Sequence, residues 1–205
     1  MKIKSENARQ VGELLQVLYE GCYAFTAVLD VATREHAEAQ GSPIDYRKQR
    51  YVARKDGSAH TFAHDHYLRV AHEHPQVSAE LKHAWFAGAL LNAGNALKRF
   101  QYFDNAPPLE MIFHLRNGVA HGNKFEFDQR SAARLQRNPA HTRSSWSRGP
   151  GVFEIFESLR GQPIMFDYMA DGDIIDVLSS ARSHLTVLAN QIDEGKKIRP
   201  SDDSV

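Results

Sequence analysis

The sequence predicts an all-α fold, a bundle of four to five helices with small β-hairpin insertions. Apolar residues recur every three or four positions along several long segments, which is the spacing of amphipathic helices. Glycine and proline separate these segments, and some of the stretches between them alternate apolar and polar residues as strands do. A chain of 205 residues is long enough to bury a core within one domain.

The composition argues against several classes of protein. Lys and Arg together number 25, and so do Asp and Glu, so the formal net charge is zero and no general attraction toward nucleic acid or a membrane follows. Cys22 is the single cysteine, which excludes a disulfide within the chain and favours a cytoplasmic location. No run approaches the roughly 18 apolar residues of a membrane-spanning helix, so no association with a membrane is expected.

The first predicted helix extends from Ser5 to about residue 39 and is ended by Gly41 and Pro43. Its apolar residues are spaced alternately four and three apart, which makes one continuous seam on one face, as in a helical bundle. The seam consists of Val11, Leu15, Leu18, Cys22, Phe25, Leu29 and Ala32.

The first insertion is expected at about 41–76. Asp56-Gly57 lies between two short runs that contain Tyr, Val and Phe, which predicts a hairpin. A short helix should follow and end before Pro75. The next main helix is expected over residues 78–100, and its small residues favour close helix packing.

Pro107 and Pro108 favour the start of another helix, and a last main helix is predicted from Asp171 to Ile192. Between these two lies the second expected insertion, at about 123–170, polar and irregular to about residue 150 and then a β-hairpin on both sides of Arg160-Gly161. Residues 1–193 therefore read as a single helical domain with two insertions, and residues 194–205 as a disordered polar tail.

The helix that starts at the two prolines has two different faces. An apolar stripe runs along one side, and Glu110, His114, Asn117 and His121 fall on the other, with Arg116 between the faces. Glu110 is expected to face solvent in the first turn, where the helix dipole favours a carboxylate.

Arg116, Asn117 and His121 are suited to chemistry on a phosphate. An arginine guanidinium can hold a phosphate through two hydrogen bonds, and a histidine exchanges a proton near neutral pH. Asn117 could orient the His121 ring or hold a substrate oxygen. Because the 2′-hydroxyl of RNA supplies a nucleophile, this set needs neither a metal ion nor another cofactor.

The string "LRNGVAHG", residues 115–122, is more specific than the bare spacing of Arg116 and His121. Arg-x-x-x-x-His alone should occur roughly once by chance in a chain of this composition, and Arg69 and His74 also fit it. The fuller Arg-Asn-x-x-x-His-Gly should occur on the order of 0.002 times. The string resembles the signature of the HEPN superfamily of α-helical bundles, and the order of the main helices is similar as well.

The resemblance implies a metal-independent endoribonuclease that works as a symmetric homodimer. Arg116 would stabilise the phosphate, His121 would be the general acid or base, and Asn117 would assist them. His114 is an auxiliary candidate from its position alone, one turn from Asn117 and two turns from His121; the alternative is a polar surface or interface residue. Family members often act as toxins paired with a cognate antitoxin protein or as effectors of phage defence. Others are non-catalytic modules that bind RNA, a nucleotide or a partner protein.

Other interpretations stay open for these residues. Arg116 and His121 could form a structural hydrogen-bond cluster at the helix end, in a chain that serves only as a structural interaction protein. Five residues correspond to about 140° around a straight helix, so the two side chains diverge. Either the helix ends or bends near Gly118, or the arginine reaches around, or each residue works with groups of a second chain.

The arginine-rich segment after this helix offers candidates for RNA binding: Arg130, Arg134, Arg137, Arg143 and Trp146. Cations can follow a phosphate backbone and a tryptophan can stack on a base, although a solvated loop would have the same composition. Five histidines between His60 and His74 are loosely spaced and no cysteine joins them, so no metal site is expected there.

Overall fold

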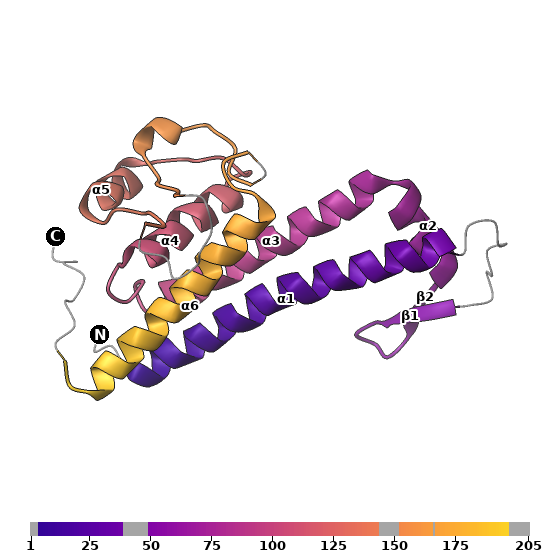
Figure 1. Cartoon of the computed structure of the whole chain (residues 1–205), viewed down its shortest axis with the longest axis horizontal. Coiled ribbons are helices and arrows are strands. Elements are labelled where there is room, and N and C mark those ends of the chain that lie inside the picture. The colour runs from indigo at the N-terminus through magenta and orange to yellow at the C-terminus, as the bar shows by residue number, and fades with distance from the viewer. Residues whose placement is uncertain (1–3, 39–48, 144–151, 166, 197–205) are drawn as a thin grey trace. The chain divides into compact units, whose positions relative to one another are not determined.

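The structure, a computed structural model, describes residues 4–38, 49–143, 152–165 and 167–196, and the side chains of these except residues 30–38. The fold is mostly helical with one small antiparallel sheet (Figure 1). Within the described residues the elements are α1 (Ser5–Glu38), β1 (Gln49–Ala53), β2 (Ala59–Ala63), α2 (His64–Glu73), α3 (Pro75–Lys98), α4 (Pro107–Ala120), α5 (Gln129–Arg137), the 3-10 helix η1 (Glu157–Leu159) and α6 (Asp171–Asp193).

The chain divides into two compact units. The first unit comprises Met1–Cys22 together with Trp85–Val205, and the second comprises Tyr23–Ala84. α1 and α3 therefore each contribute to both units. The region predicted as the first insertion lies within the second unit, and the Arg116–His121 segment lies within the first.

In the first unit, α6 packs against α4 and runs antiparallel to the start of α1 (Figure 1). Arg9 near the start of α1 bonds Asp193 at the end of α6, and Arg182 donates to Gln16 Oε1 at 3.2 Å. The apolar faces of α1, α3, α4 and α6 meet in one core, and burial of these faces drives the packing of the helices. Large, fully buried side chains of that core are Leu15, Phe86, Leu90, Leu97, Leu109, Ile112 and Leu115.

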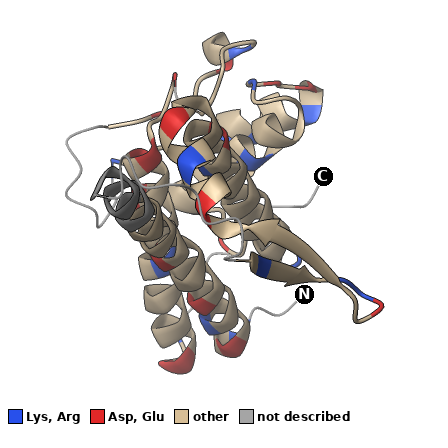
Figure 2. Ribbon diagram, turned by 90° about the vertical axis from the view of Figure 1, so that its right-hand side faces the viewer, with Lys and Arg blue, Asp and Glu red and all other residues tan. Residues whose placement is uncertain are grey.

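The second unit confirms the predicted hairpin and short helix. β1 pairs with β2 with Tyr51 opposite Thr61, and the turn between the strands uses Gly57 at a φ of +83°. Asp56 Oδ1 accepts the backbone N–H of Ser58 at 2.9 Å, an interaction typical of such turns. The charges at the turn between the strands are of both signs (Figure 2).

The main helices predicted from apolar spacing are confirmed as α1, α3, α4 and α6, with ends within a few residues of those expected. α4 begins at Pro107, which needs no N–H bond at that position. The helix expected before Pro75 is confirmed as α2, and Pro75 itself opens α3.

The hairpin predicted near residues 152–169 is wrong, because the described part of that stretch forms no paired strands of its own. Its backbone pairs instead with the segments that follow α4 and α5. Phe125 exchanges bonds with Gln162 and Gly161, and Ile155 donates to Ala140 O at 2.9 Å. Phe153 and Ile155 of this stretch pack toward the core, whereas Val152 and Phe156 are exposed.

The irregular region predicted after residue 123 contains the unpredicted helix α5. Asp128 caps it, because its Oδ1 accepts the backbone N–H of Ser131 at 2.6 Å. Only Ala132 and Leu135 of this helix are apolar residues that pack on the core, so the apolar pattern is too short to be recognised. Residues 197–205 of the predicted disordered tail lie outside the described residues, and Glu194 to Lys196 end α6 in a turn.

A left-handed turn connects α3 to α4. Gln101, Tyr102 and Phe103 have φ values of 53°, 58° and 55°, a conformation that costs roughly 1–2 kcal/mol per residue with a Cβ. Several contacts hold it: the Tyr102 hydroxyl donates to Gly94 O at 3.1 Å, and Phe103 is buried in the core. His184 of α6 also lies 2.9 Å from a carboxylate oxygen of Asp104. The turn is therefore fixed by tertiary contacts, against its local preference.

Charged residues of both signs are spread along the helices (Figure 2). No helix in the described part of the chain combines the length and the apolar character needed to cross a bilayer.

Gly118, the first of the two glycines in residues 115–122, is required by packing. A Cβ at Gly118 would overlap Ile164 Cδ1 and lie 2.6 Å from Lys124 O, whereas a Cβ at Gly88 of α3 would meet nothing within 4 Å. We expect Gly118→Ala to destabilise the fold by about 1–3 kcal/mol through overpacking. Gly88→Ala, the matched control, should stabilise it by about 0.5–1 kcal/mol. Urea unfolding of both variants measures this, and equal effects of the two substitutions would contradict the packing argument.

Candidate functional site

α4 ends within the signature string. Its last residue is Ala120, and the backbone N–H of His121 bonds the carbonyls of Asn117 and Gly118, each at 3.1 Å. Gly122 follows with a φ of +87°, a value that suits glycine at a helix end. The helix therefore ends two residues after Gly118, and His121 occupies its C-terminal cap, where the chain turns away.

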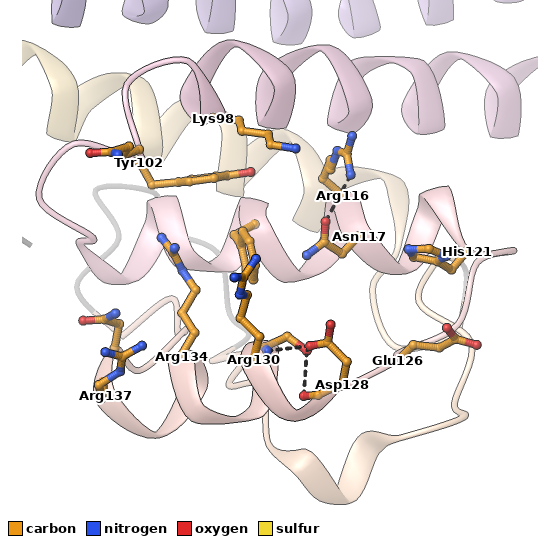
Figure 3. A pocket seen from close by; sticks show the side chains of 14 residues that line it. Lys98, Tyr102, Arg116, Asn117, His121, Glu126, Asp128, Arg130, Arg134 and Arg137 are labelled. Carbon is orange, nitrogen blue, oxygen red and sulfur yellow. Dashed lines mark hydrogen bonds between the residues drawn. The ribbon is translucent and has the colours of Figure 1, made fainter. Parts of the chain in front are cut away.

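A pocket of about 890 Å³ lies beside α4 in the first unit (Figure 3). Its walls come from the end of α3, the left-handed turn, α4, the segment that leads into α5, and α5 itself. Arg116, Asn117 and His121 all line it, so the three residues of the signature share one pocket. The lining residues are Lys98, Gln101, Tyr102, Phe113, Arg116, Asn117, His121, Glu126, Asp128, Arg130, Ser131, Arg134, Arg137 and Asn138.

The guanidinium of Arg116 is held in place from two sides. It donates to Asn95 Oδ1 at 2.9 Å and to Asn117 Oδ1 at 3.1 Å. Its aliphatic stem lies over Gly94, where an added Cβ would come within 2.5 Å of Arg116 Cγ. Each terminal nitrogen of a guanidinium carries two N–H groups, so one N–H on each remains for a ligand. Arg116 is thus positioned before any ligand arrives.

Arg116 and His121 lie on different parts of the pocket wall (Figure 3). The arginine side chain reaches toward α3, while His121 is exposed at the helix end. No hydrogen bond joins these two described side chains, and Asn117 bonds Arg116 rather than His121. Within one chain, the two residues line the same pocket because α4 ends just before His121 and because the arginine side chain is long.

Three of the predicted RNA-binding residues also reach this pocket. Arg130, Arg134 and Arg137 are spaced four and three apart on α5, which puts them on one side of that helix. Arg143 does not line the pocket, and its guanidinium pairs with Glu154. Trp146 lies outside the described residues.

Arg134 is used by the fold rather than left free for a ligand. It binds Glu110 through two hydrogen bonds, at 2.7 Å and 2.6 Å, and donates to Asn105 Oδ1 at 2.7 Å. Its guanidinium carbon also lies 4.4 Å from the ring centre of Phe113 and 5.0 Å from that of Tyr102, within the range of cation–π contacts.

The expectation that Glu110 faces solvent is wrong, since its exposed fraction is 0%. Arg134 of α5 reaches Glu110 on the polar face of α4, and the carboxylate is buried there with Arg134 as its partner. A buried carboxylate needs such a partner. The helix-dipole argument did not predict this burial, because the partner of Glu110, Arg134, is 24 residues away in the sequence.

His114 lies in the core and is not among the residues that line the pocket. Its exposed fraction is 3%, and its ring contacts the edge of Phe113 with ring centres 4.8 Å apart. Burial lowers the pKa of His114 to about 4, with the nearby charge of Arg134 as a second cause. The imidazole is therefore neutral at ordinary pH, and its Nε2 is buried without a hydrogen-bond partner.

The pocket has an uneven distribution of charge. Among the described residues, no carboxylate forms an ion pair with Lys98, Arg116, Arg130 or Arg137. Lys98 was not identified from the sequence, because only the packing of α3 beside α4 brings it to the pocket. The arrangement is suited to binding an anion.

Two carboxylates also line the pocket, Glu126 and Asp128. Hydrogen bonds from Ser131 lower the pKa of Asp128, which keeps this carboxylate charged. Glu126 lies on the same side of the view as His121, and Arg137 lies on the opposite side (Figure 3).

Tyr102 forms part of the wall as a structural group. Burial raises the pKa of Tyr102 to about 12, so its hydroxyl stays protonated and keeps donating to Gly94 O.

As for metal binding, no group of three or more His, Cys, Asp or Glu side chains in the described part of the chain is arranged to hold an ion.

Comparisons with known proteins give no relative. No protein-family model matches the chain, and neither a curated protein nor a solved structure is significantly similar to it.

Loss of Arg134 should leave the buried Glu110 carboxylate unpaired. We expect Arg134→Met to destabilise the fold by about 3–5 kcal/mol. The matched control is Arg160→Met, which breaks the exposed Arg160–Glu157 pair, with side-chain exposures of 54% and 53%, and should cost about 0–1 kcal/mol. Denaturant unfolding compares the two variants. Adding Glu110→Leu to Arg134→Met should recover part of the loss, and a small effect of Arg134→Met alone would show that the pair is not essential.

His114 should make the fold sensitive to acid. The unfolded chain binds the histidine proton with a pKa near 6.5, but native His114 binds it only near 4. Because the unfolded state holds more protons in this window, stability falls as the pH falls from about 6.5 to about 4. Between pH 7 and pH 5 the loss due to His114 should be about 2 kcal/mol.

Unfolding of the wild type and of His114→Gln at both pH values measures this contribution. The variant should lose less stability than the wild type, while His83→Gln, which alters an exposed histidine of α3, should lose as much. Equal losses in the wild type and His114→Gln would contradict the assignment.

Proposed function

We propose that this chain is a HEPN-type endoribonuclease that cleaves RNA without a metal ion. One observation carries the proposal: Arg116, Asn117 and His121, the residues of the signature string, line a single pocket whose other cations are largely unpaired. The mostly helical fold agrees with it, although many functions share helical folds.

In the proposed reaction, Arg116 binds the non-bridging oxygens of the scissile phosphate with its two remaining N–H groups. The RNA 2′-oxygen forms a bond to phosphorus and the bond to the 5′-oxygen breaks, which leaves a 2′,3′-cyclic phosphate and a 5′-hydroxyl. His121 takes the proton of the attacking hydroxyl as general base while water protonates the leaving oxygen, or it protonates the leaving oxygen as general acid while water takes the hydroxyl proton. Lys98 and Arg116 stabilise the charge that develops on the phosphate.

The proposal includes a homodimer. Gly88, Asn92 and Asn95 lie on one face of α3; Asn92 and Asn95 are exposed, and there is open space beside Gly88. Asn95 also bonds Arg116, so a second chain seated on this face would lie next to the site. A role as a toxin or phage-defence effector, with a cognate antitoxin protein, rests on the sequence resemblance alone.

A second candidate function is a non-catalytic HEPN-type module that binds RNA, a nucleotide or a partner protein in the same pocket. The observation that favours it is the separation of Arg116 and His121, which share no hydrogen bond and face different parts of the wall. Binding needs only the cations, whereas cleavage needs the histidine close to the reacting oxygen.

Cleavage of diverse RNAs by the purified protein in the presence of EDTA tests the proposal. We expect His121→Ala to lower the rate by about 10²–10⁴-fold and Arg116→Ala by about 10²–10³-fold. His83→Ala and Arg160→Ala alter exposed residues outside the pocket and should keep the wild-type rate.

No cleavage by the wild type, with RNA binding that requires Arg116, would replace the proposed enzyme by the binding module. Cleavage that survives in both site variants would place the activity outside this pocket or in a contaminant. Circular dichroism and sedimentation should first show that all variants share the fold and the oligomeric state.

A further inference from the structure

The cations of α5 lie at two separate places along the pocket. Arg130 and Arg137 are seven residues apart, which is about 10.5 Å along a helix axis. Arg134 lies between them but is already bound to Glu110. The free cations of α5 are therefore divided by one that is neutralised.

Figure 3 shows different surroundings for the two free arginines. Arg130 points from α5 toward α4, and Lys98 extends toward Arg116 from the opposite wall. Arg137 lies at the far end of the pocket from His121. Its Nε donates to Ala133 O at 3.4 Å, which leaves its terminal nitrogens for a ligand. One phosphate group is too small to contact both ends.

In Figure 3 Glu126 lies at the opposite end of the pocket, near His121, and Asp128 lies between Glu126 and Arg130. Both carboxylates are therefore on the His121 side of Arg130, and the charge of Arg130 helps to lower the pKa of Asp128. A polyanion that passes Arg116 is therefore favoured to continue toward Arg137 and repelled from the end near Glu126. Tyr102 is buried, and the Arg134 guanidinium lies over one face of the Tyr102 ring and one face of the Phe113 ring, so those faces are closed to a stacked base.

We propose that the pocket binds a single-stranded RNA through its backbone, with one phosphate at Arg116, Lys98 and Arg130 and a second at Arg137, so that the strand continues in one direction only. This inference rests on the proposed function, because it assigns the Arg116 end to the scissile phosphate. The volume of about 890 Å³ is near the upper end for ligand pockets and has room for more than the reacting phosphate. Recognition is of the backbone, so affinity should be largely independent of base sequence.

Binding of short strands tests the inference separately from cleavage. The probes are dinucleotides with a 2′-deoxy sugar at the scissile position, which blocks cleavage, carrying an extra phosphate at the 5′ end, at the 3′ end, or at neither. An extra phosphate at one end only should raise the affinity of the wild type about tenfold. Arg137→Gln should remove that gain and leave the affinity of the unextended dinucleotide unchanged, and Arg160→Gln is the matched control.

The salt dependence of binding to a longer single strand gives a second readout. Loss of one phosphate contact should lower the slope of log K against log salt by about 0.7, so Arg137→Gln should show this change and Arg160→Gln should not. Equal gains at both ends, an unchanged slope in Arg137→Gln, or a nucleoside triphosphate that binds as tightly as the extended strand would each overturn the inference. If the wild type cleaves RNA but shows any of these results, the proposed function stands and only the second phosphate site is overturned. If the binding results are as expected but the wild type does not cleave RNA, only the proposed nuclease activity is overturned.

Discussion

The buried contact between Glu110 and Arg134 organises the part of the molecule that holds the pocket. A carboxylate removed from water needs a compensating charge, and here that charge comes from α5, the helix that faces α4. The same guanidinium bonds Asn105 and lies over two aromatic rings. One ion pair thus connects α5, the left-handed turn and the polar face of α4, and these three form much of the pocket wall together with the end of α3 and the segment before α5. Arg134, which the sequence suggests as an RNA-binding residue, is in this case a structural residue.

The signature string combines packing and chemistry in adjacent positions. Gly118 allows the backbone of Lys124 to pass close to the helix, and Asn117 orients Arg116. His121 lies at the cap, where its backbone closes the helix and its side chain remains exposed. Among the described residues, no hydrogen-bond partner contacts the His121 side chain, and Arg116 keeps N–H groups beyond its bonds to Asn95 and Asn117.

Long periodic segments could be predicted from the sequence, because each of these helices carries its own apolar face, and Pro107 marked the start of α4. α5 could not, since its attachment depends on Asp128 as a cap and on Arg134 meeting a glutamate 24 residues earlier. The stretch after residue 152 has the alternation of a strand, but its backbone partners lie near residues 125 and 140. In the site, the grouping of Arg116, Asn117 and His121 follows from one helix, whereas Lys98 and the burial of Glu110 follow only from packing between helices.

The seat of Arg116 on Gly94 has a consequence for how this site can change in evolution. A methyl group at position 94 would come within 2.5 Å of the arginine stem, so a larger residue there would force the guanidinium away from Asn95 and out of its present direction. Gly94 and Arg116 belong to different helices, yet position 94 cannot gain a side chain unless Arg116 moves or is replaced. In related chains the two positions should therefore covary: a side chain at position 94 should occur where position 116 has a residue other than arginine in this conformation.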